Sequence, residues 1–198
     1  MATITELSQL DLSGTYSYAD YLKWRFDERI ELLRGKIARM SPAPSVNHQR
    51  ISGNFYGYLF NYFVNQPCQL FSAPFDVRLY NRKKSIKGNG EIYSVVQPDI
   101  CLVCDQSKLD KQGCNGAPEL VIEILSPGNS QREMDEKFEL YQEAGVQEYW
   151  LVEPVQKAVF VYVLNEQEKY IGLKPATKQL VSPSFPDLTI DLGKIFGS

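Results

Sequence analysis

The chain has 198 residues with an ordinary globular composition, which is long enough for one domain with a sizeable core. Its formal net charge of −3 argues against strong non-specific binding to nucleic acid, although a local basic patch can still bind it. The sequence shows no apolar run long enough to span a membrane, and residues 1–15 lack the features of a signal peptide. We therefore expect a cytoplasmic protein with no membrane partner, in which residues 1–16 form a loosely ordered lead-in.

A short helix and a hairpin are predicted first. Ser17 begins a capping box that opens a short amphipathic helix through about Phe26. The segment Arg29–Met40 predicts two strands that turn at residues 34–35. Glu31 lies between two apolar residues of the first strand, so we expect it on the exposed face, and a position in a pocket stays open.

A long helix is predicted next, over Ser45–Asn65, because apolar residues recur there at helical spacing. His48, the only histidine of the chain, lies on the apolar stripe in the first turn. One histidine cannot build a zinc site without other ligands. A hydrogen-bonded histidine at a helix start is therefore favoured over a catalytic base, and a position in a pocket again stays open.

Four short strands and a basic loop follow. The strands are predicted over Gln69–Phe71, Phe75–Tyr80, Ile92–Val96 and Ile100–Cys104. The loop between the second and third strands is a solvated tip or a contact for phosphate groups, and its basic residues are Arg82, Lys83, Lys84 and Lys87. Asp99 precedes the fourth strand, where a turn aspartate usually accepts hydrogen bonds from local backbone amides. Residues 105–117 are expected to form a connection.

The four cysteines are Cys68, Cys101, Cys104 and Cys114. Cys101 and Cys104 have CxxC spacing, but residues three apart on a strand face opposite sides and cannot both chelate one ion. The sequence has no second CxxC or CxxH after them, and a redox CxxC would open a helix. We expect buried structural thiols in a reducing compartment.

The central part of the chain predicts a strand, a helix and a second strand. Leu120–Leu125 is an apolar run typical of a strand buried on both faces, yet it contains Glu123, and a buried carboxylate is costly unless it is paired, metal-bound or protonated. The helix begins at Ser130 and ends at Gly145. Lys137 lies at the border of its apolar face, where a lysine usually covers apolar surface with its stem. An inward Glu123 would instead draw the ammonium toward the sheet.

The last third completes the predicted sheet. Tyr149–Val152 is expected to be parallel to Leu120–Leu125 if the helix between them is a right-handed crossover. Val159–Leu164 and Lys169–Leu173 predict an antiparallel hairpin, and Val181–Phe196 adds short apolar pieces. The pattern contains no convincing linker.

Asp99 and Glu123 together suggest a metal site. Two carboxylates on adjacent strands can hold a divalent cation such as Mg²⁺, which prefers oxygen ligands. Such an ion can activate water and offset charge on a phosphate, and a lysine nearby can stabilise the transition state. Lys137 is the candidate lysine for this role. Lys137→Ala is expected to abolish any metal-dependent hydrolysis of a phosphate ester at this site while leaving folding nearly intact.

This arrangement resembles the PD-(D/E)XK superfamily of restriction-endonuclease-like nucleases, with the motif letters at Pro98-Asp99 and Glu123. The chain is also similar to the Uma-two (Uma2) family, which is abundant in cyanobacteria. The resembling segments are Ile30–Pro42, the helix with His48, Gln97–Ile100, Leu120–Pro127 and Lys137–Pro154. The superfamily pattern has a lysine two residues after the acid, where this chain has Leu125. The resemblance implies that Lys137, on the following helix, takes that role.

The resemblance implies one restriction-endonuclease-like domain over residues 1–198, of the α/β class at the border to α+β, with a mixed central β-sheet flanked by helices on both faces. It implies a hydrolase, a DNA endonuclease dependent on Mg²⁺ or Mn²⁺, with Asp99 and Glu123 as metal ligands. A homodimer or higher homo-oligomer is expected for a double-strand cutter.

The alternative is a non-catalytic nucleic-acid-binding or regulatory module on a nuclease fold, which Leu125 and the acidic net charge favour. A third alternative is a structural protein whose acids are satisfied by hydrogen bonds.

Overall fold

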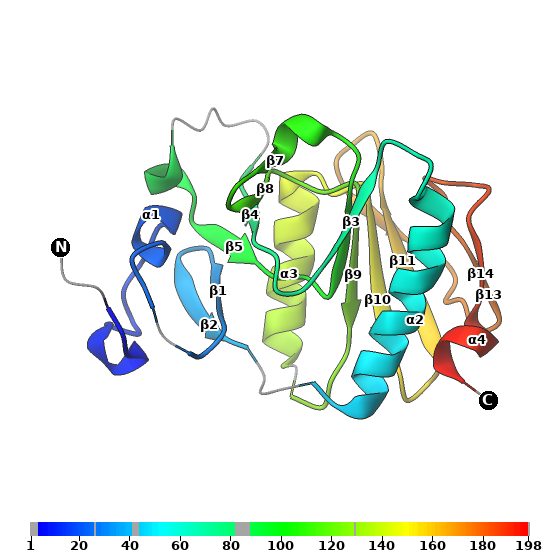
Figure 1. Cartoon of the computed structure of the whole chain (residues 1–198), viewed down its shortest axis with the longest axis horizontal. Coiled ribbons are helices and arrows are strands. Elements are labelled where there is room, and N and C mark those ends of the chain that lie inside the picture. The colour runs from blue at the N-terminus through cyan, green and yellow to red at the C-terminus, as the bar shows by residue number, and fades with distance from the viewer. Residues whose placement is uncertain (1–3, 26, 41–43, 82–87, 129, 198) are drawn as a thin grey trace.

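The computed structural model describes residues 4–25, 27–40, 44–81, 88–128 and 130–197. Its central feature is a six-stranded mixed sheet in the order β12-β11-β10-β9-β6-β3 (Figure 1). The strands of this sheet are β3 (Gln69–Ser72), β6 (Ile100–Val103), β9 (Leu120–Ile124), β10 (Glu148–Glu153), β11 (Ala158–Leu164) and β12 (Tyr170–Gly172). Strands β9 and β10 are parallel and the other neighbours are antiparallel, which confirms the predicted crossover and the final hairpin.

A second sheet of six short strands has the order β2-β1-β5-β4-β8-β7. Its strands are β1 (Ile30–Leu33), β2 (Lys36–Arg39), β4 (Val77–Leu79), β5 (Ser94–Val96), β7 (Leu109–Asp110) and β8 (Gly113–Asn115). The hairpin β1–β2 turns at residues 34–35 as predicted. The strands β7 and β8 lie in the segment expected to be a connection, because they are too short and polar to leave a periodic pattern.

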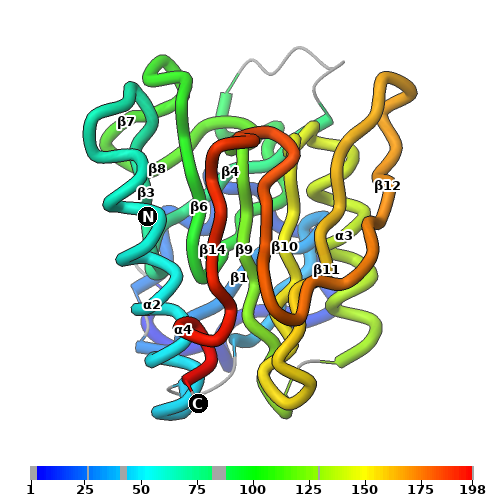
Figure 2. Tube along the Cα trace, turned by 90° about the vertical axis from the view of Figure 1, so that its right-hand side faces the viewer, coloured from blue at the N-terminus to red at the C-terminus, as the bar shows by residue number. Residues whose placement is uncertain are grey.

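The helices cover both faces of the central sheet. In Figure 1, α3 (Gln131–Ala144) lies between the two sheets, while α2 (Val46–Phe63) and α4 (Leu192–Phe196) lie on the far side of the central sheet. The two-stranded sheet of β13 (Gln179–Val181) and β14 (Thr189–Asp191) lies on the same side as α4 (Figure 2). Helix α2 buries Phe55 and Leu59 against Ile122 of β9, and α3 buries Leu140 and Tyr141 against the opposite face.

Capping residues set the ends of the two long helices. The Ser45 side chain accepts from the His48 backbone N–H at the start of α2, and the Ser130 side chain accepts from the Glu133 N–H at the start of α3. Gly145 ends α3 in the left-handed conformation, with φ of 91°. Both helices therefore begin and end close to where the sequence predicts.

The first helix is shorter than predicted. Helix α1 spans Tyr18–Tyr21 and ends before Trp24, which is earlier than the sequence predicts. The reason is tertiary packing, because Trp24 leaves the helical path to form a β-bridge with Ile4 and is 7% exposed. Three-residue 3₁₀ helices lie at Leu7–Gln9, Asn89–Glu91 and Gln106–Lys108.

The expectation of four free thiols is wrong for one pair. Cys68 and Cys104 form a disulfide, while Cys101 and Cys114 are free and buried. The antiparallel register of β3 and β6 pairs Gln69 with Val103, so the residues just outside this pair lie opposite each other. The spacing of neighbouring cysteines does not reveal a partner 36 residues away in the sequence. With a disulfide present, the cysteines no longer support a reducing compartment.

Arg82, Lys83, Lys84 and Lys87 of the basic loop lie outside the described residues. Among the helices of the described residues, none has the length and apolar character needed to cross a bilayer.

Candidate active site

The pairing of β6 with β9 brings Asp99 and Glu123 to one end of the central sheet. Ile100 pairs with Ile122, so the residues that precede one and follow the other are close neighbours. Both carboxylates line a cavity of about 550 Å³. The expectation that Asp99 binds local amides is wrong, because its Oδ2 accepts from the backbone N–H of Ile124, on the neighbouring strand, at 2.8 Å.

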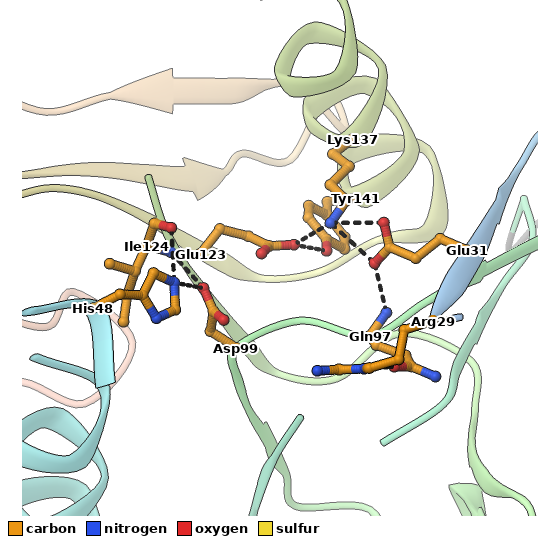
Figure 3. A network of polar contacts seen from close by, with 9 residues as sticks. All are labelled: Arg29, Glu31, His48, Gln97, Asp99, Glu123, Ile124, Lys137 and Tyr141. Atoms are coloured by element: carbon orange, nitrogen blue, oxygen red, sulfur yellow. Dashed lines mark hydrogen bonds and ion pairs between the residues drawn. The ribbon is translucent and has the colours of Figure 1, made fainter. Parts of the chain in front are cut away.

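The Lys137 ammonium is directed at the sheet and lies beside Glu123 (Figure 3). Its Nζ is 3.0 Å from Oε1 of Glu123, and the Tyr141 hydroxyl donates to the same oxygen at 2.6 Å. The side chain of Lys137 is only 11% exposed. The interpretation of Lys137 as a surface lysine that covers apolar groups is therefore wrong, and the buried Glu123 has the partner that the sequence required.

Glu31 is a third carboxylate of the same site. Its two oxygens lie 2.9 and 3.0 Å from Nζ of Lys137, and its Oε1 accepts from the backbone N–H of Gln97 at 2.7 Å. Glu31 is 1% exposed, so the expectation of an exposed-face glutamate is wrong and the alternative position in a pocket is the one observed.

The His48 ring lies at the other end of the cavity, next to Asp99. Its Nε2 is 3.2 Å from the carbonyl oxygen of Ile124 and 3.3 Å from Oδ2 of Asp99, so Nε2 carries the proton and donates. Its Nδ1 is buried and has no hydrogen-bond partner among the described residues. The hydrogen bond to Asp99 raises the pKa of His48 above its usual 6.5, although burial opposes the change. His48 therefore holds one oxygen of Asp99 in place.

Burial controls the charge of the site. It raises the pKa of Glu123 to about 7; Lys137 opposes this increase, and the charges of Asp99 and Glu31 add to it. Burial alone would lower the pKa of Lys137, but Glu123 and Glu31 outweigh it and raise that pKa above the usual value. At neutral pH the charged Lys137 therefore lies between Glu31 and Glu123, and Glu123 is only partly ionised.

Asp99 and Glu123 each keep one oxygen without a hydrogen bond from the described residues. Glu123 accepts at Oε1 and Asp99 accepts at Oδ2, which leaves Oε2 and Oδ1 for the cavity. Proteins often hold Mg²⁺ by one or two carboxylates, with water and substrate phosphate as further ligands. This pair fits such an ion, even though no three His, Cys, Asp or Glu side chains of the described ranges gather into a metal cluster.

Sequence reasoning did not assign three residues of the site. Tyr141 lies on the apolar stripe of its helix and therefore looks like a core residue. It follows Lys137 by one helical turn, so if Lys137 is directed at Glu123, the Tyr141 side chain also faces Glu123. Gln97 holds Glu31 by its backbone N–H, and its side-chain oxygen accepts from Arg29 at 2.9 and 3.3 Å. Neither Gln97 nor Arg29 has a pattern that distinguishes it from a surface residue.

The raised pKa values predict that stability falls as pH rises. The pKa of Glu123 is about 7 in the folded protein against 4.5 ordinarily, so the folded state binds this proton more tightly. Its contribution is present at low pH and is lost as pH rises through 7, and the raised pKa of His48 acts in the same direction. Melting temperatures from pH 5 to 8 should therefore decline more steeply for wild type than for Glu123→Gln. Equal slopes would contradict the raised pKa of Glu123.

The fold defines a restriction-endonuclease-like class of protein. A solved structure from Anabaena variabilis ATCC 29413, described as a “putative nuclease belonging to DUF820”, matches with a TM-score of 0.69 and 22% identity, over 91% of this chain and 97% of that chain. The match confirms the predicted fold class, with the second sheet as an addition that was not predicted.

The chain belongs to the Uma2 family, whose model, described as “Putative restriction endonuclease”, matches residues 18–193. The uncharacterised protein slr1290 of Synechocystis sp. is 25% identical over 157 residues, which cover 78% of this chain and 77% of that protein. The family match confirms the resemblance drawn from the five sequence segments.

Proposed function

We propose that the protein is a DNA endonuclease that hydrolyses phosphodiester bonds with Mg²⁺ or Mn²⁺ held by Asp99 and Glu123. One observation carries the proposal: Asp99 and Glu123 line one cavity, each with one oxygen that accepts no hydrogen bond from the described residues, and the Lys137 ammonium lies beside Glu123. A bound divalent ion would activate water and offset the charge of the phosphate.

The residues around the carboxylate pair have separate tasks in this proposal. The Ile124 N–H and His48 fix Oδ2 of Asp99, and Tyr141 and Lys137 fix Oε1 of Glu123. The free oxygens are thereby oriented before any ligand arrives, which is how preorganised sites reduce the cost of reaction. The positive charge of Lys137 stabilises the negative charge that develops on the phosphate.

Lys137 takes the place of the lysine that is absent at Leu125. Helix α3 begins close after β9, so its second turn lies over the end of the strand that carries Glu123. Arg29 also lines the cavity, and its exposed guanidinium is positioned by Gln97 to contact a substrate phosphate. The cavity thus offers two cations to a polyanionic substrate.

We further propose that residues 1–198 act as one domain and that a homodimer cuts both strands of DNA. The test is incubation of purified protein with supercoiled plasmid in Mg²⁺ or Mn²⁺, with EDTA as the control. Metal-dependent nicking is expected. Metal-independent binding of DNA without nicking would favour the alternative, a non-catalytic nucleic-acid-binding or regulatory module.

The basic loop is proposed to contact phosphate groups of the substrate. Replacing Arg82, Lys83, Lys84 or Lys87 with glutamine should weaken DNA binding, and each true phosphate contact removed should reduce the slope of log affinity against log salt by about one. Fluorescence anisotropy at several salt concentrations measures the slope, with Lys174→Gln as a control in the exposed C-terminal part. If the fully neutralised loop keeps the wild-type slope and affinity, it is only a solvated tip.

A further inference from the structure

Lys137 is held from two sides by carboxylates that belong to different sheets. Glu123 of β9 in the central sheet contacts Nζ with one oxygen, at 3.0 Å. Glu31 of β1 in the second sheet contacts it with both oxygens, at 2.9 and 3.0 Å. Figure 3 shows the ammonium between the two groups. Glu31 therefore supplies two of the three carboxylate oxygens around this cation.

Glu31 is itself fixed in position. It lies within a four-residue strand whose residues are all buried, and the Gln97 backbone N–H donates to its Oε1 at 2.7 Å. The Gln97 side chain is held in turn, because it donates to Oδ1 of Asp76 at 2.9 Å and accepts from Arg29. The carboxylate of Glu31 therefore has a defined place even without Lys137.

The Glu123 carboxylate would have to serve both Lys137 and a divalent ion. Its Oε1 accepts from Lys137 and Tyr141, and its Oε2 is free for the cavity that Asp99 also lines. A cation held by Asp99 and Glu123 would draw on the same negative charge that faces Lys137. A buried ammonium whose only partner is shared in this way would be poorly compensated, and buried charges without full compensation are strongly destabilising.

We propose that Glu31 is the anchor of Lys137, a positioning residue that keeps the ammonium beside the Asp99–Glu123 pair when Glu123 engages a cation. The role of Lys137 in DNA cleavage rests on the proposed function. The anchoring of Lys137 by Glu31 rests only on the contacts between these two residues. In this proposal Glu31 contacts neither the substrate nor the divalent ion, and it acts only through Lys137.

The anchoring is tested by the reactivity of Lys137 toward an acylating reagent. Purified wild-type protein and Glu31→Gln are treated with acetic anhydride, and the acetylation of Lys137 is followed by peptide mass spectrometry. Glutamine keeps the shape and accepts the Gln97 bond, but the charged partner is lost, so Lys137 should react about tenfold faster or more. Glu119→Gln is the matched control, because it removes the carboxylate partner of a different lysine, Lys108, at 2.6 Å; Lys137 in that variant should react as in wild type.

The catalytic consequence is tested by steady-state cleavage. Glu31→Gln should lower kcat by about 100-fold, the effect of a small misplacement of a catalytic group, with little change in KM. Glu31→Asp keeps the charge on a shorter stem and should recover part of kcat. A residue that only supports the fold would not produce this split between kcat and KM or this recovery.

The two outcomes separate the two proposals. If Lys137 reacts equally fast in wild type and in Glu31→Gln, the anchoring is refuted whether or not the protein cleaves DNA. If Lys137 becomes reactive in the variant but wild type cleaves no DNA, the anchoring stands and the proposed function fails. Should Glu31→Gln not fold, Glu31→Asp is labelled instead. Its shorter stem keeps the charge but weakens the contact with the ammonium, so Lys137 should react faster than in wild type, and equal rates would refute the anchoring.

Discussion

Replacing Lys137 with methionine is expected to lower the free energy of unfolding by about 3–5 kcal/mol, the cost of removing one partner of a buried ion pair. The substitution would leave Glu31 and Glu123 close together without a positive charge between them. Methionine fills a similar volume, so the loss comes from charge rather than from a cavity. This expected loss of stability replaces the expectation from sequence that a substitution of Lys137 leaves folding nearly intact.

Urea denaturation at pH 7 measures this loss. Lys23→Met is the matched control, because Lys23 pairs with Asp20 on the surface and its side chain is 45% exposed. Exposed pairs contribute about 0–1 kcal/mol, so the control should lose much less stability. Equal losses in the two variants would contradict the description of Lys137 as a buried, doubly paired cation.

Replacing Asp99 with asparagine is expected to reduce DNA cleavage by on the order of 100- to 1000-fold, the size of effect seen when one preorganised catalytic group is removed. Asparagine keeps the shape of the side chain and its amide oxygen can still accept from the Ile124 N–H, so the fold should persist. The loss follows from the charge of Asp99, which the proposed cation site requires.

Cleavage rates on supercoiled plasmid with saturating Mg²⁺ test this expectation. Asp105→Asn is the control, because Asp105 is exposed at the far end of β6 and its carboxylate accepts from the backbone N–H and the hydroxyl of Ser107. It should cut at the wild-type rate. An Asp99→Asn variant that cuts as fast as wild type would remove Asp99 from the site.

The sequence predicts the central part of the site well, for local reasons. Glu123 interrupts an apolar strand, and the helix that follows has clear capping residues, so the parallel unit around α3 and the inward direction of Lys137 can be inferred. The adjacency of Asp99 and Glu123 also follows, because neighbouring strands of one sheet bring their ends together.

The remaining features depend on contacts between segments distant in the sequence. Glu31 looks exposed until Lys137, 106 residues later, is placed beside it. The disulfide of Cys68 with Cys104 depends on the register of two strands. Tyr141 occupies a core position and a site position at once, and only its hydroxyl contact with Glu123 distinguishes the two. The pattern of residues along the sequence does not show which distant residues come into contact, so it predicts none of these pairings.

The central claim, that Asp99 and Glu123 share one divalent cation, is tested most directly by calorimetric titration of the protein with Mn²⁺. We expect one ion per chain in wild type, with an affinity for Mn²⁺ that increases with pH because Glu123 must lose its proton to bind. Asp99→Asn and Glu123→Gln should each abolish this binding, while Asp105→Asn should keep it. Wild-type protein that binds no Mn²⁺, or binding that survives both substitutions, would contradict the account.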